Sequence, residues 1–219
     1  MSHVFIIGAA GQVGRHLVKQ LAARGHRVRA LHRKPEQAGT LQQDGATPVA
    51  GDLLQLDADA LAALLAGSET MVFTAGAGGK GGEEMTRAID GRGLELAVDA
   101  ARRAGVRRVL LVSAFPEAGR AQHLSDTFET YMAVKKQADV HLATSGLDWV
   151  ILRPGTLTDS AGTGRITAGP AIAYGDIPRE DVAATLVALV ERPQVSRQII
   201  EVTAGHTDIR EALAYCSGT

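Results

Sequence analysis

The sequence predicts an α/β fold, a doubly wound parallel sheet with helices on both faces and a small C-terminal lobe. Strand and helix patterns alternate along the whole chain, which is typical of parallel strands joined by helices. Several of the expected strands are apolar throughout, as strands covered on both faces should be. The first strand also runs directly into a glycine-rich turn and an amphipathic helix, the usual start of such a sheet.

The first half of the chain gives four strands. We expect them at residues 4–7, 27–32, 47–50 and 70–75. A helix with Leu17, Val18 and Leu21 on one face follows the first strand and stops at Gly25. A second helix, with Asp57 as its N-cap, is predicted at 57–65.

The second half continues the alternation after a flexible loop at 76–82. Helices are predicted at 84–104, 127–144 and 179–191, strands at 109–113, 149–152 and 198–203, and a short helix at the end. Residues 156–178 are expected to be irregular. No linker or repeat interrupts the chain, so we expect one domain over residues 1–219, with residues 154–180 forming a small substrate lobe.

The composition limits the classes of partner. A chain of 219 residues suits one α/β domain. With 23 basic and 24 acidic residues, the net charge is −1, which gives no electrostatic reason to expect a nucleic acid or membrane partner. The sequence has one local cluster of basic residues, which consists of Arg102, Arg103, Arg107 and Arg108. These residues are expected to be solvated and to interact favourably with the dipole at a helix C-terminus.

Cysteine and histidine usage gives no sign of a metal site. Cys216 is the only cysteine, and the seven histidines show no metal-ligand spacing. We therefore expect neither a disulfide within the chain nor a metal. No basic leader precedes the first strand and no apolar run reaches the length of a membrane span, so a cytoplasmic location is expected.

The turn after the first strand has the character of a dinucleotide site. Gly8 permits a turn that a Cβ would resist, Gly11 lets backbone N–H groups approach a pyrophosphate, and Gly14 lets the helix pack close to the strand. Gln12 and Val13 lie at the helix start, where free N–H groups favour an anion. The alternative is a structural turn that happens to be rich in glycine.

The residue after the second strand bears on the choice of cofactor. Arg33 stands about 20 residues past the glycines, where this kind of fold meets the adenosine ribose. A guanidinium suits a 2′-phosphate, so NADP is predicted in preference to NAD. Glu36 is the nearby residue that could reverse this choice, and Arg33 could instead be a solvated surface charge.

Tyr131 and Lys135 are the candidate reactive pair. Their i, i+4 spacing places a phenol and an ammonium on one helical face. A nearby ammonium is expected to lower the pKa of the phenol, which could then exchange a proton with a carbonyl or alcohol oxygen. Ser113, at the end of the fifth strand, could polarise the same oxygen, or it could satisfy local backbone groups.

The chain resembles the atypical short-chain dehydrogenase/reductases, a group described as NAD(P)-dependent epimerase/dehydratase-like. The resemblance rests on the glycine triad, Asp52-Leu53, Ser113, the Tyr131/Lys135 pair and the turn Arg153-Pro154-Gly155, in the family's order. It implies that Asp52 and Leu53 contact adenine, and that Lys135 holds the nicotinamide ribose. It also adds Pro154 to the cofactor site, while the small Ala75 and Gly76 leave room for a cofactor to cross the sheet edge.

The chain departs from the family pattern at two places. Asp90 stands where the catalytic asparagine of many members falls, and a carboxylate lacks the N–H donors of an amide. Ala114 and Phe115 follow Ser113, where many members have further serines.

These residues favour an NADP-dependent oxidoreductase that acts on a small carbonyl or alcohol, with Tyr131 as acid/base and Asp90 positioning Lys135. The alternatives are a sugar epimerase or dehydratase, disfavoured because only 65 residues follow Pro154, and a non-catalytic NADP-binding redox sensor similar to NmrA-type regulators. Aromatic residues make up 4% of the chain, which predicts no stacking platform for a flavin or quinone. We expect a small-molecule substrate and a monomer or a homodimer.

Overall fold

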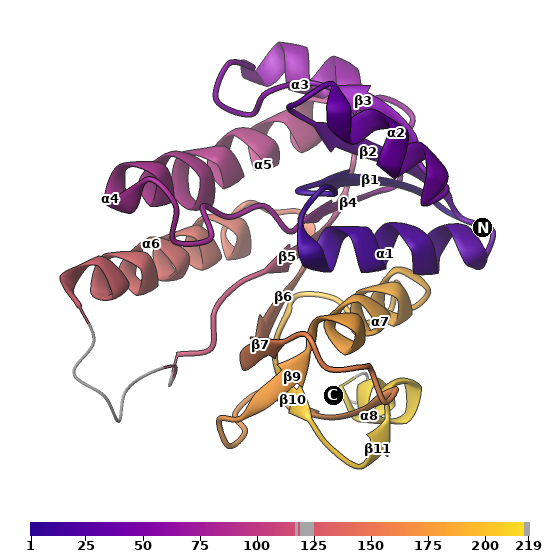
Figure 1. The fold of residues 1–219 in the computed structure, drawn as a ribbon, viewed down its shortest axis with the longest axis vertical. Helices are drawn as coiled ribbons and strands as arrows, with labels where there is room; N and C mark the ends of the chain where they lie inside the picture. Colours follow the sequence, from indigo (N-terminus) through magenta and orange to yellow (C-terminus); the bar gives the residue numbers. More distant parts are fainter. Residues whose placement is uncertain (117, 119–124, 217–219) are drawn as a thin grey trace.

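The computed structural model describes residues 1–116, 118 and 125–216 (Figure 1). The strands are β1 (His3–Ile7), β2 (Arg27–His32), β3 (Thr47–Ala50), β4 (Thr70–Phe73), β5 (Arg108–Val112), β6 (Asp148–Pro154), β7 (Thr156–Thr158), β8 (Arg165–Gly169), β9 (Asp176–Pro178), β10 (Gln198–Ala204) and β11 (Thr207–Asp208). The helices are α1 (Gln12–Ala23), α2 (Glu36–Gln43), α3 (Ala58–Leu65), α4 (Gly82–Met85), the π-helix η1 (Thr86–Gly93), α5 (Leu94–Arg103), α6 (Asp126–Ala143), α7 (Arg179–Val190) and α8 (Ile209–Tyr215).

The main sheet confirms the predicted doubly wound α/β class. Its order in the described chain is β11-β8-β10-β6-β5-β4-β1-β2-β3. The strands from β10 to β3 are parallel, whereas β8 and β11 close one end with antiparallel pairing. The chain winds outward in one direction from β1 to β3 and in the other from β4 onward. The carboxyl ends of β1 and β4 therefore flank the reversal point where such sheets bind ligands.

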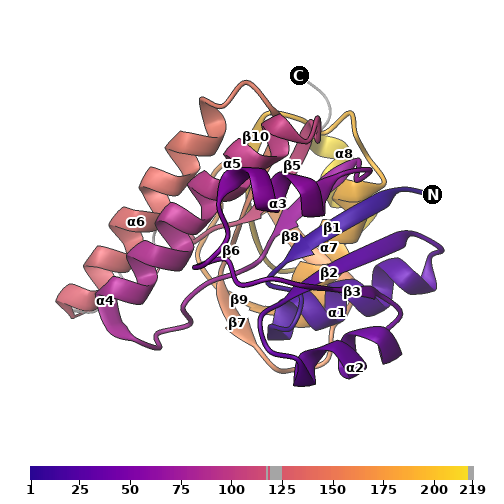
Figure 2. The same ribbon diagram turned by 90° about the horizontal axis from the view of Figure 1, so that it is seen from above.

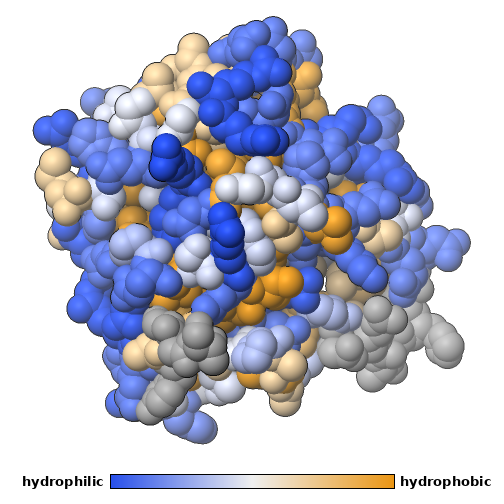
Figure 3. All heavy atoms as spheres, turned by 180° about the vertical axis from the view of Figure 1, so that it is seen from behind, coloured by the Kyte–Doolittle hydropathy of each residue, from blue (hydrophilic) through white to orange (hydrophobic). Residues whose placement is uncertain are grey.

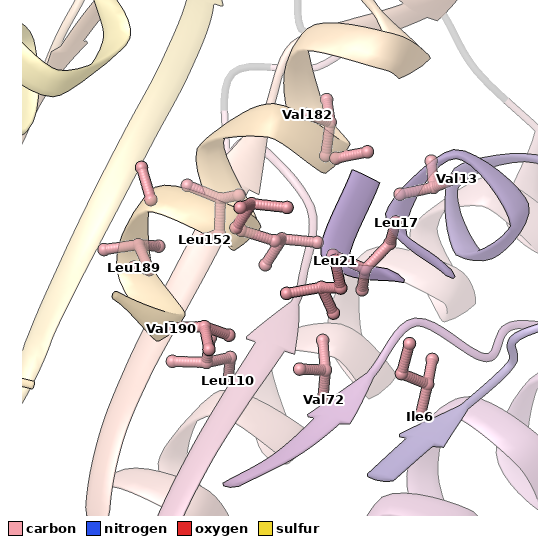
Figure 4. Close-up of a cluster of buried hydrophobic side chains, with 14 of the residues drawn as sticks. Ile6, Val13, Leu17, Leu21, Val72, Leu110, Leu152, Val182, Leu189 and Val190 are labelled. Atoms are coloured by element: carbon pink, nitrogen blue, oxygen red, sulfur yellow. The ribbon is translucent and has the colours of Figure 1, made fainter. Parts of the chain in front are cut away.

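Helices cover both faces of the sheet (Figures 1 and 2), and an apolar layer lies between the sheet and the helices on each face. Alternate strand residues point to opposite sides. Ile6 and Leu110 pack with α1 and α7 on one face, as Figure 4 shows. Phe5 and Leu111 pack with α3, α5 and α6 on the other. The continuous apolar strands of the sequence are thus explained by burial on both faces.

The structure differs from the expectations in three segments. Helix α2 was not predicted, because only Leu41 of its residues is buried and no apolar period marks it. The helix expected at 84–104 contains η1, a widened π segment that the sequence pattern does not reveal. The region expected to be irregular, 156–178, contains β7, β8 and β9. Of these, β7 pairs with β9 apart from the main sheet, while β8 joins its edge.

The interpretation of Arg108 as a solvated charge is wrong. Arg108 is buried at the start of β5, and its guanidinium donates to the carbonyl oxygens of Leu189 at 2.9 Å and Val195 at 3.0 Å. It also pairs with Asp148 at 3.1 Å. Arg108 therefore supplies charged donors to carbonyl groups at and beyond the end of α7, where helical hydrogen bonds run out.

At the end of the main sheet opposite β11, the outermost strand is β3, which is short and contains a proline. Strand β3 has four residues, and Pro48 pairs in register with Ala30 of β2. The outer side of this strand has no neighbour in the described sheet.

Hydrophilic side chains predominate on the face of the molecule shown in Figure 3, and hydrophobic ones form patches between them. Among the described residues, no helix combines the length and the apolar character needed to cross a membrane.

Candidate active site

A cleft opens at the carboxyl ends of β1 and β4. It consists of two adjoining cavities of about 620 Å³ and about 590 Å³. Both are lined by the same central residues, which come from the glycine turn and from the segment after β4; these are Gly11, Gln12, Thr74, Ala75, Gly76 and Gly78. One elongated ligand can therefore lie across the sheet edge and reach both cavities.

The glycine turn between β1 and α1 has room for backbone alone. Gly8 has φ +92°, and a Cβ there would overlap the backbone of Ala75. A Cβ at Gly14 would overlap the carbonyl oxygen of Gly8, so Gly14 lets α1 pack against the turn, and it lines neither cavity.

The start of α1 fits the pyrophosphate of a dinucleotide. Gly11 is its N-cap, no side chain caps the helix, and no acidic residue lies in its first turn. The N–H groups of that turn are therefore available to an anion in the cleft. Gln12 and Val13, at the start of α1, line the larger of the two cavities.

The smaller cavity brings together the residues expected at the adenosine end. Arg33, Asp52 and Leu53 all line it. Arg33 is exposed, and its side chain forms no ion pair within the described residues. Glu36 does not line this cavity and lies 4.0 Å from the Lys34 ammonium. The Asp52 carboxylate accepts a hydrogen bond from the Leu54 N–H at 3.0 Å.

The larger cavity brings together the four candidate catalytic residues. Tyr131 and Lys135 extend from α6, Ser113 follows β5, and Asp90 comes from η1. Pro154, at the end of β6, lines the same cavity. Four separate elements, α6, β5, η1 and β6, therefore converge beside the central part of the cleft.

Lys135 is buried in an ion pair. Its ammonium lies 3.5 Å from Asp90 Oδ1 and donates to the Val112 carbonyl at 3.0 Å. The other oxygen of Asp90 accepts from the Ala77 N–H at 3.0 Å. Asp90 is 2% exposed and Lys135 is 4% exposed, so water screens this pair only weakly. The widened turn of η1 carries Asp90, and π segments are frequent at functional sites.

Tyr131 does not have the lowered pKa that the sequence suggested. Burial, followed by the negative charges of Asp90 and Asp139, raises the pKa of its phenol to about 12. The expectation failed because burial disfavours the charged phenolate and because Asp90 and Asp139 oppose the effect of the Lys135 ammonium. In the free protein, Tyr131 is therefore a protonated phenol at neutral pH.

Asp139 and Arg153 are part of the site that sequence reasoning missed. Asp139 is buried, and its Oδ2 accepts from Arg153 Nε at 3.0 Å and Nη2 at 2.9 Å. Burial raises the pKa of the Asp139 carboxyl, although Ser113, Arg153 and Lys135 oppose this shift. The available signal was the i, i+4, i+8 spacing of Tyr131, Lys135 and Asp139 on one helical face.

Ser113 is directed away from its expected role in the free protein. Its Oγ is closed off from solvent, as is Asp139 Oδ1. The hydroxyl interacts with the Asp139 carboxylate, but the geometry falls short of a well-formed hydrogen bond. Ser113 nevertheless lines the larger cavity, so its role toward a substrate oxygen stays a prediction.

The expectation that the chain lacks a stacking platform is wrong. Four aromatic residues line the larger cavity: Phe115, Phe128, Tyr131 and Tyr174. The rings of Phe115 and Tyr174 meet edge to face with centroids 5.2 Å apart, and those of Phe128 and Tyr131 lie 6.0 Å apart. A low overall aromatic content did not predict this local concentration.

In the described part of the chain, no three His, Cys, Asp or Glu side chains are grouped so that they could hold a metal ion. His123 lies outside the described residues.

Several known proteins are similar to this chain over most of its length. A Bacillus subtilis protein named "Uncharacterized sugar epimerase YhfK" is 36% identical over 211 residues, which cover 96% of this chain and 98% of the relative. The solved structure of the oxidoreductase ylbE from Lactococcus lactis has a TM-score of 0.86 and 28% identity, over 97% of this chain and 95% of that one. ChuY, an anaerobillin reductase from Escherichia coli O157:H7, has a TM-score of 0.78 and 27% identity, over 94% and 99%.

A family described as NAD(P)H-binding matches residues 8–193, which include the glycine turn, the Tyr131/Lys135 pair and the turn at Pro154. The fold, the cleft at the sheet edge and these similarities all indicate a protein that binds NAD(P)H. The chain belongs to the NAD(P)H-binding family of Rossmann-fold proteins, and its oxidoreductase and epimerase-like relatives are consistent with an atypical short-chain dehydrogenase/reductase.

Proposed function

We propose that this protein is an NADPH-dependent reductase of carbonyl compounds in which Tyr131 donates the proton. The observation that carries the proposal is a protonated phenol lining the larger cavity of the cofactor cleft, above a buried Lys135–Asp90 pair. Reduction needs a proton donor beside the carbonyl oxygen, and a phenol that is protonated at neutral pH can be that donor.

The preference for NADPH rests on Arg33. Arg33 and Lys80 are both exposed cations that line the smaller cavity and have no ion-pair partner among the described residues. Arg33 is the one that follows β2, where this kind of fold meets the adenosine ribose. A guanidinium can hold a 2′-phosphate through paired, charge-assisted hydrogen bonds. Asp52, which also lines this cavity, would accept a hydrogen bond from the adenine amino group. No acidic side chain takes the place of Arg33 at the end of β2.

The protein's own residues would divide the work as follows. The start of α1 holds the pyrophosphate, and the nicotinamide supplies the hydride when it is bound. Tyr131 donates its proton to the carbonyl oxygen. Asp90 holds the Lys135 ammonium in place, and this ammonium stabilises the phenolate that remains after the proton has left.

A sugar epimerase is the second candidate, because the name of the B. subtilis relative suggests it. Such a reaction begins with oxidation of an alcohol, for which Tyr131 would have to accept a proton. The phenol holds its own proton at neutral pH, so it would first have to lose that proton before it could accept one. A nucleotide sugar would also need cations for its diphosphate. The cations that line the larger cavity, Lys135 and Arg179, are already paired with Asp90 and Asp159.

Replacement of Tyr131 by Phe tests the proposal. Oxidation of NADPH is measured with a panel of ketones, aldehydes and quinones. We expect Tyr131→Phe to lower kcat by about 10²–10⁴-fold, the usual contribution of a general acid, and to leave the Kd for NADPH nearly unchanged. Lys136→Gln, an exposed change on the same helix, is the matched control. Equal activity of wild type and Tyr131→Phe, or epimerisation of a nucleotide sugar without net NADPH oxidation, would contradict the reductase.

A further inference from the structure

We infer that the larger cavity is a stacking site for a flat, uncharged, conjugated carbonyl compound, such as an aromatic ketone or a quinone. This inference rests on the proposed reductase function and specifies its substrate class. It is carried by three observations, namely the placement of one exposed aromatic ring, the rings around it, and the pairing of nearby charges.

Tyr174 is an exposed aromatic ring that the surrounding structure holds in place. It is 42% exposed and lines the larger cavity. Its hydroxyl is 2.6 Å from Thr156 Oγ1, and the edge contact with the buried Phe115 fixes the ring from another side. The other large hydrophobic residues exposed in the described chain are Met1, Leu54 and Val140, none of them aromatic. A fixed ring left open to solvent in a cavity suits a ligand that covers it.

The remaining rings connect Tyr174 to the proton donor. Phe128 lies one helical turn before Tyr131 on α6, and the planes of their rings are inclined by 43°. Phe115 lies beneath Tyr174 after β5. Leu157 and Ala114 complete the apolar lining. A ligand that reaches the Tyr131 hydroxyl with its carbonyl oxygen therefore places the rest of its body among these rings.

The charges near these rings indicate a neutral ligand. Arg179 lines the cavity, but its guanidinium is 2.8 Å from the Asp159 carboxylate. Lys135 is paired with Asp90. Within the described lining, no cation therefore remains unpaired to neutralise a phosphate or carboxylate on the ligand. A flat neutral compound would gain stacking as well as burial, whereas a saturated compound of the same size would gain burial alone.

Two bicyclic ketones test this inference. The probes are 1-tetralone, which has an aromatic ring, and 1-decalone, its saturated counterpart. Their binding is measured by calorimetry on the protein loaded with NADP⁺, which cannot reduce them, so the readout is binding and not turnover. We expect 1-tetralone to bind the wild type about tenfold more tightly, because aromatic pairing adds up to roughly 1.4 kcal/mol beyond burial, which is a factor of about ten in Kd.

The variants Tyr174→Leu and Phe128→Leu keep apolar bulk and remove the ring. We expect each to weaken 1-tetralone binding by about five- to tenfold and to leave 1-decalone binding within about twofold. Val140→Ala, an exposed change on α6 outside the cavity, is the control. Tyr174→Phe keeps the ring without the bond to Thr156 and should retain most of the preference.

The outcomes separate this inference from the proposed function. Equal binding of the two ketones to the wild type, or equal losses of both ketones in the Leu variants, overturns the stacking site even if aliphatic carbonyls are reduced. A preference for 1-tetralone that depends on Tyr174 and Phe128 supports the stacking site. If NADPH then reduces no compound of the panel, the reductase proposal fails while the binding site stands.

Discussion

The proton at Tyr131 is governed first by the burial of the phenol and then by the charges around it. Asp90 and Asp139 contribute two negative charges near the phenol, and Lys135 and Arg153 contribute two positive ones. The phenol itself is largely buried. Because burial and the two carboxylates favour the neutral phenol, the pKa of Tyr131 is raised to about 12. This balance predicts how activity depends on pH.

We expect Asp90→Asn to shift the alkaline limb of the pH profile. A reductase that needs protonated Tyr131 loses activity as pH rises through the pKa of that phenol. Asp90 raises this pKa, so removing its charge should lower the pKa and move the loss of activity toward neutral pH by at most about one unit, because burial is the larger cause and remains. The measurement is kcat/KM against pH. Asp99→Asn, exposed and paired with Arg103 on α5, should leave the limb in place, and an unmoved limb in Asp90→Asn would refute the assignment.

The residues that could be recognised from the sequence are those whose function depends on local spacing. The glycine turn lies within seven residues, and Tyr131 and Lys135 lie one helical turn apart. Arg153 and Asp139, by contrast, come from β6 and α6 and meet only when the helix packs on the strand. The predicted direction of the shift in the Tyr131 pKa was also wrong. That shift depends on burial and on carboxylates that only the folded chain brings close to the phenol.

At the scale of elements, regular helices and buried strands were predictable, while segments without an apolar period were not. Helix α2 buries Leu41 alone of its residues. Strands β7 to β9 have three to five residues each and lie in a Gly- and Thr-rich region. Their pairing is set by contacts with distant strands, so short-range patterns carry little information about them.

Arg108 links β5 to the end of α7, and this link makes a stability prediction. Arg108→Met leaves the carbonyl oxygens of Leu189 and Val195 without this donor and Asp148 without its cation. We expect the free energy of unfolding to fall by about 3 kcal/mol, because buried acceptors lose charge-assisted hydrogen bonds. Denaturant unfolding measures this loss. Arg107→Met removes an exposed charge one residue away and should change stability by less than about 0.5 kcal/mol; equal effects would show that Arg108 has no special role.

At the scale of the whole molecule, the cleft lies where the two halves of the sheet meet. Residues after β1 and β2 form one side, and residues after β4, β5 and β6 form the other. A dinucleotide that fills both cavities therefore connects the two halves and should stabilise the entire fold.

We expect NADPH to raise the thermal midpoint by about 5–10 °C at a hundredfold excess over its Kd, from about 2.7 kcal/mol of linked stabilisation. NADH at the same concentration should raise it less, because Arg33 then has no 2′-phosphate to bind. Differential scanning calorimetry measures both shifts. In Arg33→Ser, NADPH and NADH should raise the thermal midpoint by similar amounts. An NADH shift as large as that of NADPH in the wild type would contradict the assigned preference.

The two ends of the main sheet bear on how copies of the chain can associate. Open strand edges are the usual route to disordered aggregation. Here the outermost strand at one end, β11, has two residues, and at the other end β3 has four and contains Pro48, which has no backbone N–H to donate. Neither edge offers a long row of unpaired backbone groups to a second molecule. Edge-to-edge pairing of the main sheet is therefore a poor route by which two copies of the described chain could associate.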